Sequence, residues 1–340
     1  MQSETIEKTT PLTRKDFKTD QAVRWCPGCG DYMILANMQK AFAQMDHAKE
    51  NILSISGIGC SSRITYYLET FGIHSVHGRA LPVATGAKLA NPELNVWVFS
   101  GDGDSMAIGG NHFIHACRRN VDLNLVIFNN KIYGMTKGQS SPTTPVGVKT
   151  KTAPEGSYEN PFNIGEIAIG AGATFYARVP DNDPKLMEDA MMQAYHHKGF
   201  SVIEVLQNCV IFTDGIHEQI TGRDTKDENQ VVVEEGQPIV FGKDKEFGLK
   251  VNGMKLKKIT LENEIGGSLV HDATEPDTAM HLALARMQLP DFPVATGIIR
   301  SVEKPNYAKD VHQAIADAKE RSSYKSVHDL IRSGNTWEIV

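Results

Sequence analysis

The chain has 340 residues, of which 41% are hydrophobic and 22% charged, and its formal net charge is −6. This length and apolar content suit one large α/β domain or two domains. A net negative charge offers no basic footprint, so we expect no nucleic-acid partner. The N-terminal residues lack the apolar core of a signal peptide, and no apolar run approaches the ~18 residues of a membrane-spanning helix. We therefore expect a cytoplasmic protein without a membrane contact.

Short apolar runs alternate with helical patterns over the first two thirds of the chain. Buried parallel strands are predicted at 51–57, 95–100, 123–129, 173–179 and 201–206. Helices are predicted at 111–120 and at 183–199, the second with an aspartate start and a glycine stop. The alternation predicts an α/β fold with a doubly wound, mostly parallel sheet.

After about residue 207 the pattern becomes polar and acidic, with scattered glycines. We expect irregular structure with one or two hairpins there, followed by helices near 307–321 and 324–332. The predicted organisation is an N-terminal extension (1–20), a main domain (21–215) and an irregular C-terminal extension with helices (216–340).

Acidic residues occupy a glycine-rich turn in "FSGDGDSMAIGG" (99–110), directly after a predicted strand. Such turns usually cradle phosphate, which carboxylates would repel unless a metal ion lies between them. Asp102 or Asp104 therefore suits a Mg²⁺ ion that in turn holds a diphosphate. The strand at 123–129 ends in Asn129 and Asn130, and strand-end loops converge at the carboxyl edge of such a sheet. The sequence predicts a magnesium and diphosphate site at that edge.

Five cysteines are an odd number, which argues against a disulfide framework in an intracellular chain. Cys26 and Cys29 lie in "RWCPGCGD", Cys60 in "SGIGCSSR" and Cys209 in "VLQNCVIF". Four thiolates from three loops suit either zinc or one [4Fe–4S] cluster, and their spacing does not choose between the two. Cys117 lies among apolar residues of a predicted helix and is interpreted as structural.

The "GDGD" turn, followed after a helix and a strand by "NN", resembles the thiamine diphosphate signature. This resemblance implies that Asp102 and Asn130 bind Mg²⁺ through side chains and Ile132 through its carbonyl. The residues implied to contact the cofactor are Gly101, Asp102, Gly103, Asp104, Asn130, Ile132 and Thr136. Thiamine chemistry also favours iron over zinc at the cysteines, because zinc cannot accept electrons from a cofactor-stabilised carbanion.

Five motifs together, "WCPGCG", "GIGCSSR", "HGRALPVATGAKLANP", "GDGDSMAIGGNH" and "NNKIYGMTKGQSSPTT", resemble the β subunits of 2-oxoacid:ferredoxin oxidoreductases. The similarity covers about residues 20–215 and is greatest to the 2-oxoglutarate type. It implies that Cys26, Cys29, Cys60 and Cys209 hold a [4Fe–4S] cluster. It also implies oxidative decarboxylation of a 2-oxoacid to an acyl-CoA, 2-oxoglutarate to succinyl-CoA, with electrons passed to ferredoxin and reversal as reductive carboxylation.

The same resemblance implies a partner α subunit, which supplies the glutamate that activates the aminopyrimidine ring. We therefore expect an obligate α/β assembly with the active site at the subunit interface, acting on coenzyme A, a 2-oxoacid and ferredoxin.

Three cationic or titratable residues near the motifs have open roles. Arg63 and Lys137 suit binding of a substrate carboxylate or the diphosphate, or else a helix ion pair and a solvated loop charge respectively. His77 suits a hydrogen bond near the reactive centre, or a packed position at a domain edge. The residues interpreted as structural or surface histidines are His112, His115, His196 and His197.

Three alternatives to the 2-oxoglutarate enzyme stay open. A pyruvate or broad-specificity 2-oxoacid:ferredoxin oxidoreductase is not separated from it by this chain, because the substrate pocket is expected to be shared with the α subunit. A non-redox thiamine diphosphate decarboxylase subunit would give the four cysteines no function. Its lack of iron would distinguish it from the oxidoreductase. A zinc-stabilised scaffold predicts zinc without thiamine.

Overall fold

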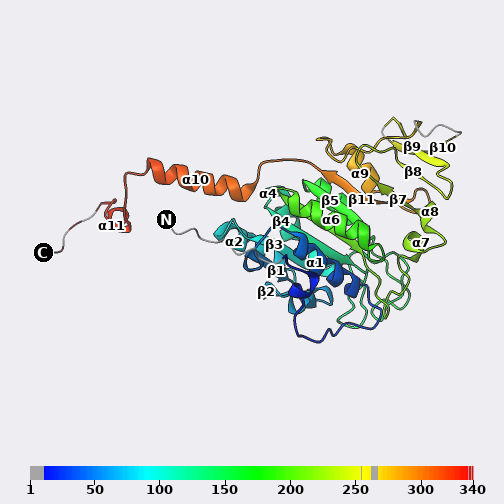
Figure 1. The fold of residues 1–340 in the computed structure, drawn as a ribbon, viewed down its shortest axis with the longest axis horizontal. Helices are drawn as coiled ribbons and strands as arrows, with labels where there is room; N and C mark the ends of the chain where they lie inside the picture. The colour runs from blue at the N-terminus through cyan, green and yellow to red at the C-terminus, as the bar shows by residue number, and fades with distance from the viewer. Residues whose placement is uncertain (1–10, 254, 262–266, 336, 338, 340) are drawn as a thin grey trace.

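The computed structural model describes residues 11–335, 337 and 339, apart from 254 and 262–266. Within these residues an eight-stranded sheet forms the centre of the molecule, and helices cover both of its faces (Figure 1). Its strands, in spatial order, are β2 (Phe71–His74), β1 (Ile52–Ser56), β3 (Asn95–Gly101), β4 (Leu123–Asn129), β6 (Phe200–Leu206), β5 (Phe175–Pro180), β11 (Val294–Ser301) and β7 (Gln230–Val233).

All neighbouring strands of this sheet pair in parallel except β11, which runs antiparallel to β5. The five predicted strands are confirmed as β1, β3, β4, β5 and β6. Each is buried along its whole length, apart from the half-buried last residue of β3. The mostly parallel α/β fold is therefore confirmed.

Helices connect the strands and were predicted best where their caps are clear. The described helices are η1 (Arg14–Phe17), α1 (Asp31–Gln44), η2 (Lys49–Asn51), η3 (Ser61–Tyr66), α2 (Ala80–Ala90), α3 (Asp102–Met106), α4 (Gly110–Arg119), α5 (Ile164–Gly170), α6 (Pro184–His196), α7 (Glu218–Thr221), α8 (Lys226–Asn229), α9 (Ala279–Ala285), α10 (Tyr307–Arg321) and α11 (Val327–Ile331). Asp183 caps α6 by accepting a hydrogen bond from the Leu186 amide at 3.0 Å. That helix ends before the predicted Gly199, because the backbone at His197 is extended.

Two apolar layers hold the helices against the sheet. Helices α2, α4, α5 and α9 pack on one face, where Cys117 is fully buried as predicted. Helices α1 and α6, with Phe17 of η1, pack on the other face. Successive residues of β3 alternate between the two layers, so that Val98 faces the first and Trp97 the second.

The chain after residue 207 is more regular than its polar sequence indicates. Strands β7 and β11 join the main sheet, and β8 (Val240–Phe241), β9 (Phe247–Asn252) and β10 (Lys255–Thr260) form a small antiparallel sheet that contains the expected hairpin. Strand β11 escaped prediction because it carries Gly297 and the fully buried Arg300. The Arg300 guanidinium donates to the carbonyls of Ala173, Glu275 and Pro276. The main sheet thus continues across the predicted boundary at 215, which remains a prediction as a domain limit.

The C-terminal helices extend from the body of the molecule as an arm (Figure 1). Helices α10 and α11 confirm the two predicted helical stretches, and Ala308 is their one buried residue among those described. Of the helices in the described ranges, none is both long enough and apolar enough to cross a membrane.

Replacing Trp97 by alanine tests the layer beneath α1. Trp97 is fully buried, packs on Phe42 with ring centroids 5.9 Å apart, and donates to the Asn95 side chain at 3.1 Å. We expect Trp97→Ala to lower the free energy of unfolding by about 3–5 kcal/mol through the cavity it leaves. The matched variant Trp337→Ala removes a side chain that is 82% exposed. It should change stability by less than about 0.5 kcal/mol in denaturant titrations, and equal effects would contradict the packing described.

Acidification should destabilise the fold through His197. Burial lowers the pKa of His197 to about 4, and its Nε2 lies 2.7 Å from the Thr174 hydroxyl. The unfolded chain binds a proton at this residue near its ordinary pKa, whereas the folded chain resists protonation. Stability is therefore present above about pH 6.5 and lost as the pH falls toward 4. Denaturant titrations between pH 4 and 7 should show a shallower loss for His197→Gln. The exposed neighbour His196→Gln is the matched control, and an unaltered slope in His197→Gln would refute the assignment.

Candidate functional site

The acidic turn lies at the carboxyl end of β3 and forms the first turn of α3. Asp102 is buried, and its Oδ2 accepts hydrogen bonds from the hydroxyls of Ser141 at 2.5 Å and Thr143 at 2.6 Å. Burial raises the pKa of Asp102 to about 6, and the two hydroxyls oppose that rise. A cation beside this carboxylate would supply the stabilisation that burial removes.

The Asp104 carboxylate accepts hydrogen bonds from the loops after β1 and β2 and from Ser100 near the end of β3. Its Oδ1 lies 2.6 Å from His77 Nδ1 and accepts from the amides of Gly78 at 2.7 Å and Ile58 at 3.1 Å. Its Oδ2 accepts from the Ser100 hydroxyl at 2.6 Å. The turn alone left Asp102 and Asp104 as alternatives for the metal, and the resemblance implied Asp102. This geometry favours the same residue, because Asp104 already fixes the position of His77.

The loop after β4 places the paired asparagines beside this turn. Asn130 Oδ1 accepts from the Ile132 amide at 3.3 Å, and its Nδ2 donates to Gln207 Oε1 at 2.8 Å. Lys131 between them has a left-handed backbone, with φ of 58°. This unusual conformation turns the chain sharply, so that both Asn130 and Ile132 face the same cavity.

That cavity has a volume of about 240 Å³ and is lined by all seven predicted cofactor residues. Its lining includes His77, Gly101, Asp102, Gly103, Asp104, Asn130, Ile132 and Thr136, together with Cys60 and Ser61. A Cβ at residue 103 would lie 2.2 Å from the Tyr133 ring, so only glycine fits there. The buried Ser61 hydroxyl has no hydrogen-bond partner among the described residues.

These features fit a diphosphate with its magnesium ion. Mg²⁺ takes one or two protein carboxylates and completes its shell with other oxygens and phosphate. Asp102, the Asn130 amide oxygen and the Ile132 carbonyl offer that donor set. The Ser61 hydroxyl, which lacks a partner within the described residues, is a suitable donor for a phosphate oxygen.

Arg63 and Lys137 are not part of this lining. The Arg63 guanidinium donates to the Tyr67 hydroxyl at 3.1 Å and stacks over Tyr66. Lys137 is exposed on the loop, with φ of 79°. The structure therefore does not bring either cation into the cavity, and their substrate roles remain predictions.

Three loops bring the four predicted cysteines to one region beside the cavity. A point at the Cβ position of Gly134 lies 3.7 Å from the sulfurs of both Cys60 and Cys209, so these sulfurs are at most twice that distance apart. The Cys29 amide donates to the Cys26 carbonyl at 3.1 Å. Burial raises the pKa of the Cys60 thiol to about 12, with further contributions from Asp31, Cys209 and Cys26. All four thiols are free.

The donor set of four thiols suits a thiolate-ligated metal centre, either zinc or one [4Fe–4S] cluster. In the described part of the chain, no group of three or more His, Cys, Asp or Glu side chains is already placed to hold a metal ion. Thiolates that share one burial site repel one another and need a cationic centre between them. The buried Asp31 side chain has no hydrogen-bond partner in the described ranges, and burial raises its pKa to about 7.

Sequence reasoning missed the polar residues that support the site. Ser141 and Thr143 lie within the quoted "SSPTT" run, and Gln207 lies two residues before Cys209, but none of them has an isolated signature. Beneath them, Glu204 accepts hydrogen bonds from Asn129 at 2.6 Å and from Arg178 at 2.9 Å. Because Arg178 neutralises the buried Glu204, the pKa of that carboxyl is lowered despite its burial.

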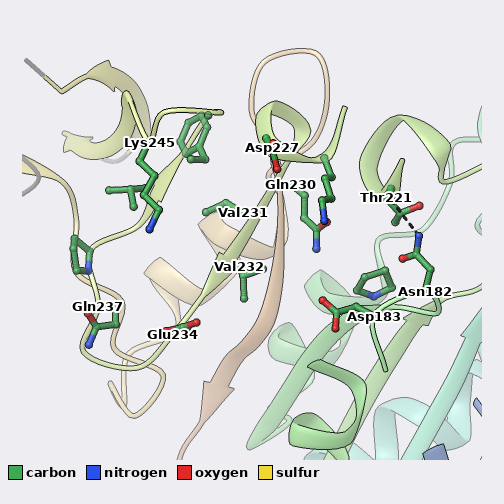
Figure 2. Close-up of a pocket in the computed structure, with 16 residues that line it drawn as sticks. Asn182, Asp183, Thr221, Asp227, Gln230, Val231, Val232, Glu234, Gln237 and Lys245 are labelled. Atoms are coloured by element: carbon green, nitrogen blue, oxygen red, sulfur yellow. Dashed lines mark hydrogen bonds between the residues drawn. The ribbon is translucent and has the colours of Figure 1, made fainter. Parts of the chain in front are cut away.

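A larger cavity, of about 730 Å³, lies elsewhere (Figure 2). Val231 and Val232 of β7 lie between Lys245 on one side and Asn182, Asp183 and Thr221 on the other. The Asn182 amide donates to the Thr221 carbonyl at 3.1 Å. None of the predicted catalytic, cofactor or metal residues lines it, so size alone does not identify the functional site.

Comparison with known proteins agrees with this geometry. Residues 57–205 match the C-terminal binding domain of thiamine pyrophosphate enzymes. The chain is 42% identical to 2-oxoglutarate oxidoreductase subunit KorB of Mycobacterium tuberculosis over 97% of this chain and 89% of that protein. It is 54% identical to 2-oxoglutarate synthase subunit KorB of Archaeoglobus fulgidus over 54% of this chain and 69% of that protein.

A solved structure is similar over almost the whole length. It is a 2-oxoglutarate:ferredoxin oxidoreductase from Magnetococcus marinus with 2-oxoglutarate, coenzyme A and succinyl-CoA bound. The TM-score is 0.78 at 29% identity, covering 97% of this chain and 98% of that one. The resemblance read from the motifs is confirmed: the chain belongs to the family of KorB subunits of 2-oxoglutarate oxidoreductases and contains a thiamine pyrophosphate binding domain.

Proposed function

We propose that this chain is the β subunit of a 2-oxoglutarate:ferredoxin oxidoreductase that converts 2-oxoglutarate and coenzyme A to succinyl-CoA, reversibly. The observation that carries this proposal is that the proposed magnesium ligands and one of the four cysteines line the same cavity. The cavity lined by Asp102 and Asn130 is also lined by Cys60, which belongs to the four-cysteine region. When bound, thiamine diphosphate would supply the nucleophilic carbon and electron sink for decarboxylation, and a [4Fe–4S] cluster would accept electrons singly.

Asp102, Asn130 and the Ile132 carbonyl would hold Mg²⁺, which in turn binds the diphosphate. The hydroxyls of Ser141 and Thr143 keep the Asp102 carboxylate in place and support its charged form. Ser61 would donate to the diphosphate, for which its free hydroxyl is suited.

The contact between His77 and Asp104 supports His77 as a residue of the reactive centre. Asp104 Oδ1 lies 2.6 Å from Nδ1, so that Nδ1 carries a proton, and Nε2 remains available to the cavity that His77 lines. An imidazole held in this tautomer is suited to accept or share a proton with a bound substrate.

An iron–sulfur centre suits the cysteines better than zinc. The sulfurs come from three loops, an arrangement that either zinc or one cluster accepts, so the redox chemistry decides between them. A cluster also gives the thiols a redox task beside the thiamine cavity, which zinc does not.

A partner α subunit would complete the site. Large apolar side chains are exposed at Phe71 and Ile73 on the edge strand β2, at Val76 in the loop that follows it, and at Ile108, which lies against Gly78. Exposed apolar side chains of this size are common at protein interaction surfaces. Ferredoxin would be the final electron acceptor, and Arg63 and Lys137 remain candidates for binding substrate carboxylates once the partner is present.

Metal and cofactor analysis of the complex tests this function. The chain is co-expressed with its partner, purified without oxygen and analysed for iron, sulfide, zinc and thiamine. We expect about four irons per chain, bound thiamine and an EPR signal that appears with 2-oxoglutarate and coenzyme A. A stronger response to pyruvate would reassign the substrate, thiamine without iron would indicate a non-redox decarboxylase, and zinc without thiamine would indicate a scaffold.

Two glycine substitutions test the role of the Asp104 and His77 pair. A Cβ at residue 57 would lie 1.8 Å from Asp104 Oδ2, whereas one at Gly86 in α2 meets no atom within 4 Å. We expect Gly57→Ala to displace the carboxylate, to cost about 1–3 kcal/mol of stability and to weaken thiamine diphosphate binding. Gly86→Ala should raise stability by roughly 0.5–1 kcal/mol and leave binding unchanged. Thermal unfolding and cofactor titration measure both, and normal cofactor binding by Gly57→Ala would contradict the role of this pair.

A further inference from the structure

Gln207 lies where the magnesium loop and the cysteine region meet. It follows the last residue of β6, is fully buried, and its backbone amide donates to the Asn129 carbonyl at 3.1 Å. The peptide bonds of β4 and β6 are therefore paired up to the residue that precedes Asn130. This pairing places the Gln207 side chain between the two proposed metal sites.

The two ends of the Gln207 amide contact different sites. Its Oε1 accepts a hydrogen bond from Asn130 Nδ2 at 2.8 Å. Its Nε2 donates to Cys29 Sγ at 3.4 Å and to the Asn208 carbonyl at 2.5 Å. The Asn208 carbonyl is an acceptor only, so the amide nitrogen must face it and the sulfur, and the oxygen must face Asn130.

This orientation has a direct consequence for Asn130. Because Nδ2 of Asn130 is directed to Gln207, its Oδ1 is left for the Ile132 amide and for the cavity. Oxygen, rather than nitrogen, is the atom that Mg²⁺ binds. By accepting from Nδ2, Gln207 Oε1 therefore orients Asn130 so that its Oδ1 faces the metal site.

The second consequence concerns Cys29. Hydrogen bonds to the sulfurs of an iron–sulfur cluster stabilise its reduced, more negative state and raise its reduction potential. The Gln207 amide supplies one such donor, because its Nε2 lies 3.4 Å from the Cys29 sulfur.

The surrounding segment holds both contacts in place. The Thr213 hydroxyl donates to the Asn130 carbonyl at 2.9 Å, and His217 Nε2 lies 2.8 Å from the Asn129 carbonyl. Burial lowers the pKa of His217 to about 3, so the ring is neutral and donates through Nε2. The segment that carries Cys209 is thus fastened to the magnesium loop independently of the Gln207 side chain.

We propose that Gln207 is a positioning residue that links the two centres: its one amide orients Asn130 for the magnesium ion and donates a hydrogen bond to the iron–sulfur ligand Cys29. This inference rests on the proposed function, because it requires both centres in the same chain. Loss of the Gln207 amide should therefore change both the Mg²⁺ affinity and the reduction potential of the cluster.

Two substitutions at residue 207 separate the halves of the proposal. Gln207→Met has a similar size but removes both the acceptor and the donor. Gln207→Glu keeps an acceptor for Asn130 but replaces the donor to Cys29. Thr213→Val is the control, since it removes a hydrogen bond between the same two segments without touching the amide. Each variant is prepared without oxygen as the complex with its partner.

Three measurements are made on each complex: iron content, the cluster midpoint potential by EPR-monitored redox titration, and Mg²⁺ affinity in the presence of thiamine diphosphate by protein fluorescence. We expect Gln207→Met to weaken Mg²⁺ binding about 10-fold, as loss of a residue that orients a metal ligand does. Its potential should become more negative than that of the wild type. Gln207→Glu should share the shift in potential but keep nearly normal Mg²⁺ affinity, and Thr213→Val should keep the wild-type potential.

Several results would overturn the proposal. Unchanged potential and Mg²⁺ affinity in fully loaded Gln207→Met would do so. A Gln207→Glu variant that loses Mg²⁺ affinity as severely as Gln207→Met would refute the orientation of Asn130. A Thr213→Val variant with an equal shift in potential would attribute the effect to loosening of the segment. If Gln207→Met fails to fold, Gln207→Glu decides alone. A wild-type complex that lacks iron or thiamine is a different failure, that of the proposed function.

Discussion

The parallel pairing of β3, β4 and β6 is the constraint on which the site depends. Parallel strands end at the same edge of a sheet, so the loops after these strands must converge there. The loop after β3 contributes Asp102, the loop after β4 contributes Asn130 and the loop after β6 contributes Cys209. Because the three strands are buried almost throughout, a change of register would expose the core as well as displace the site.

A buried polar network fixes these loops to the sheet. Glu204, inside β6, accepts hydrogen bonds from Arg178 on β5 and from Asn129 at the end of β4. Burying such charges costs energy that only complete pairing offsets. The network therefore gives the carboxyl edge of the sheet one defined geometry, on which the more exposed Asn130 and its neighbours are built.

The two donor sets share structural elements instead of occupying separate modules. Cys60 lines the thiamine cavity, and Gln207 contacts both Asn130 and Cys29. Short connections of this kind suit a reaction in which electrons leave one centre for the next. The larger cavity beside β7 lacks any such convergence, which shows why the chemistry of the lining identifies the site better than its volume does.

The sequence by itself determined the buried strands, the capped helices, the acidic and amide loops and the family, because apolar runs and strand-end motifs are local features that persist in any fold of this class. Tertiary structure alone decided three other matters. It paired Asp104 with His77, which leaves Asp102 as the proposed magnesium ligand, because that pairing depends on loops distant in the chain. It placed Arg63 and Lys137 outside the cavity, and it brought β7 and β11 into the main sheet. Gln207 shows the reason most directly. Its hydrogen-bond partners Asn130 and Cys29 lie 77 and 178 positions earlier in the chain, and contacts over such separations have no signature in a linear sequence.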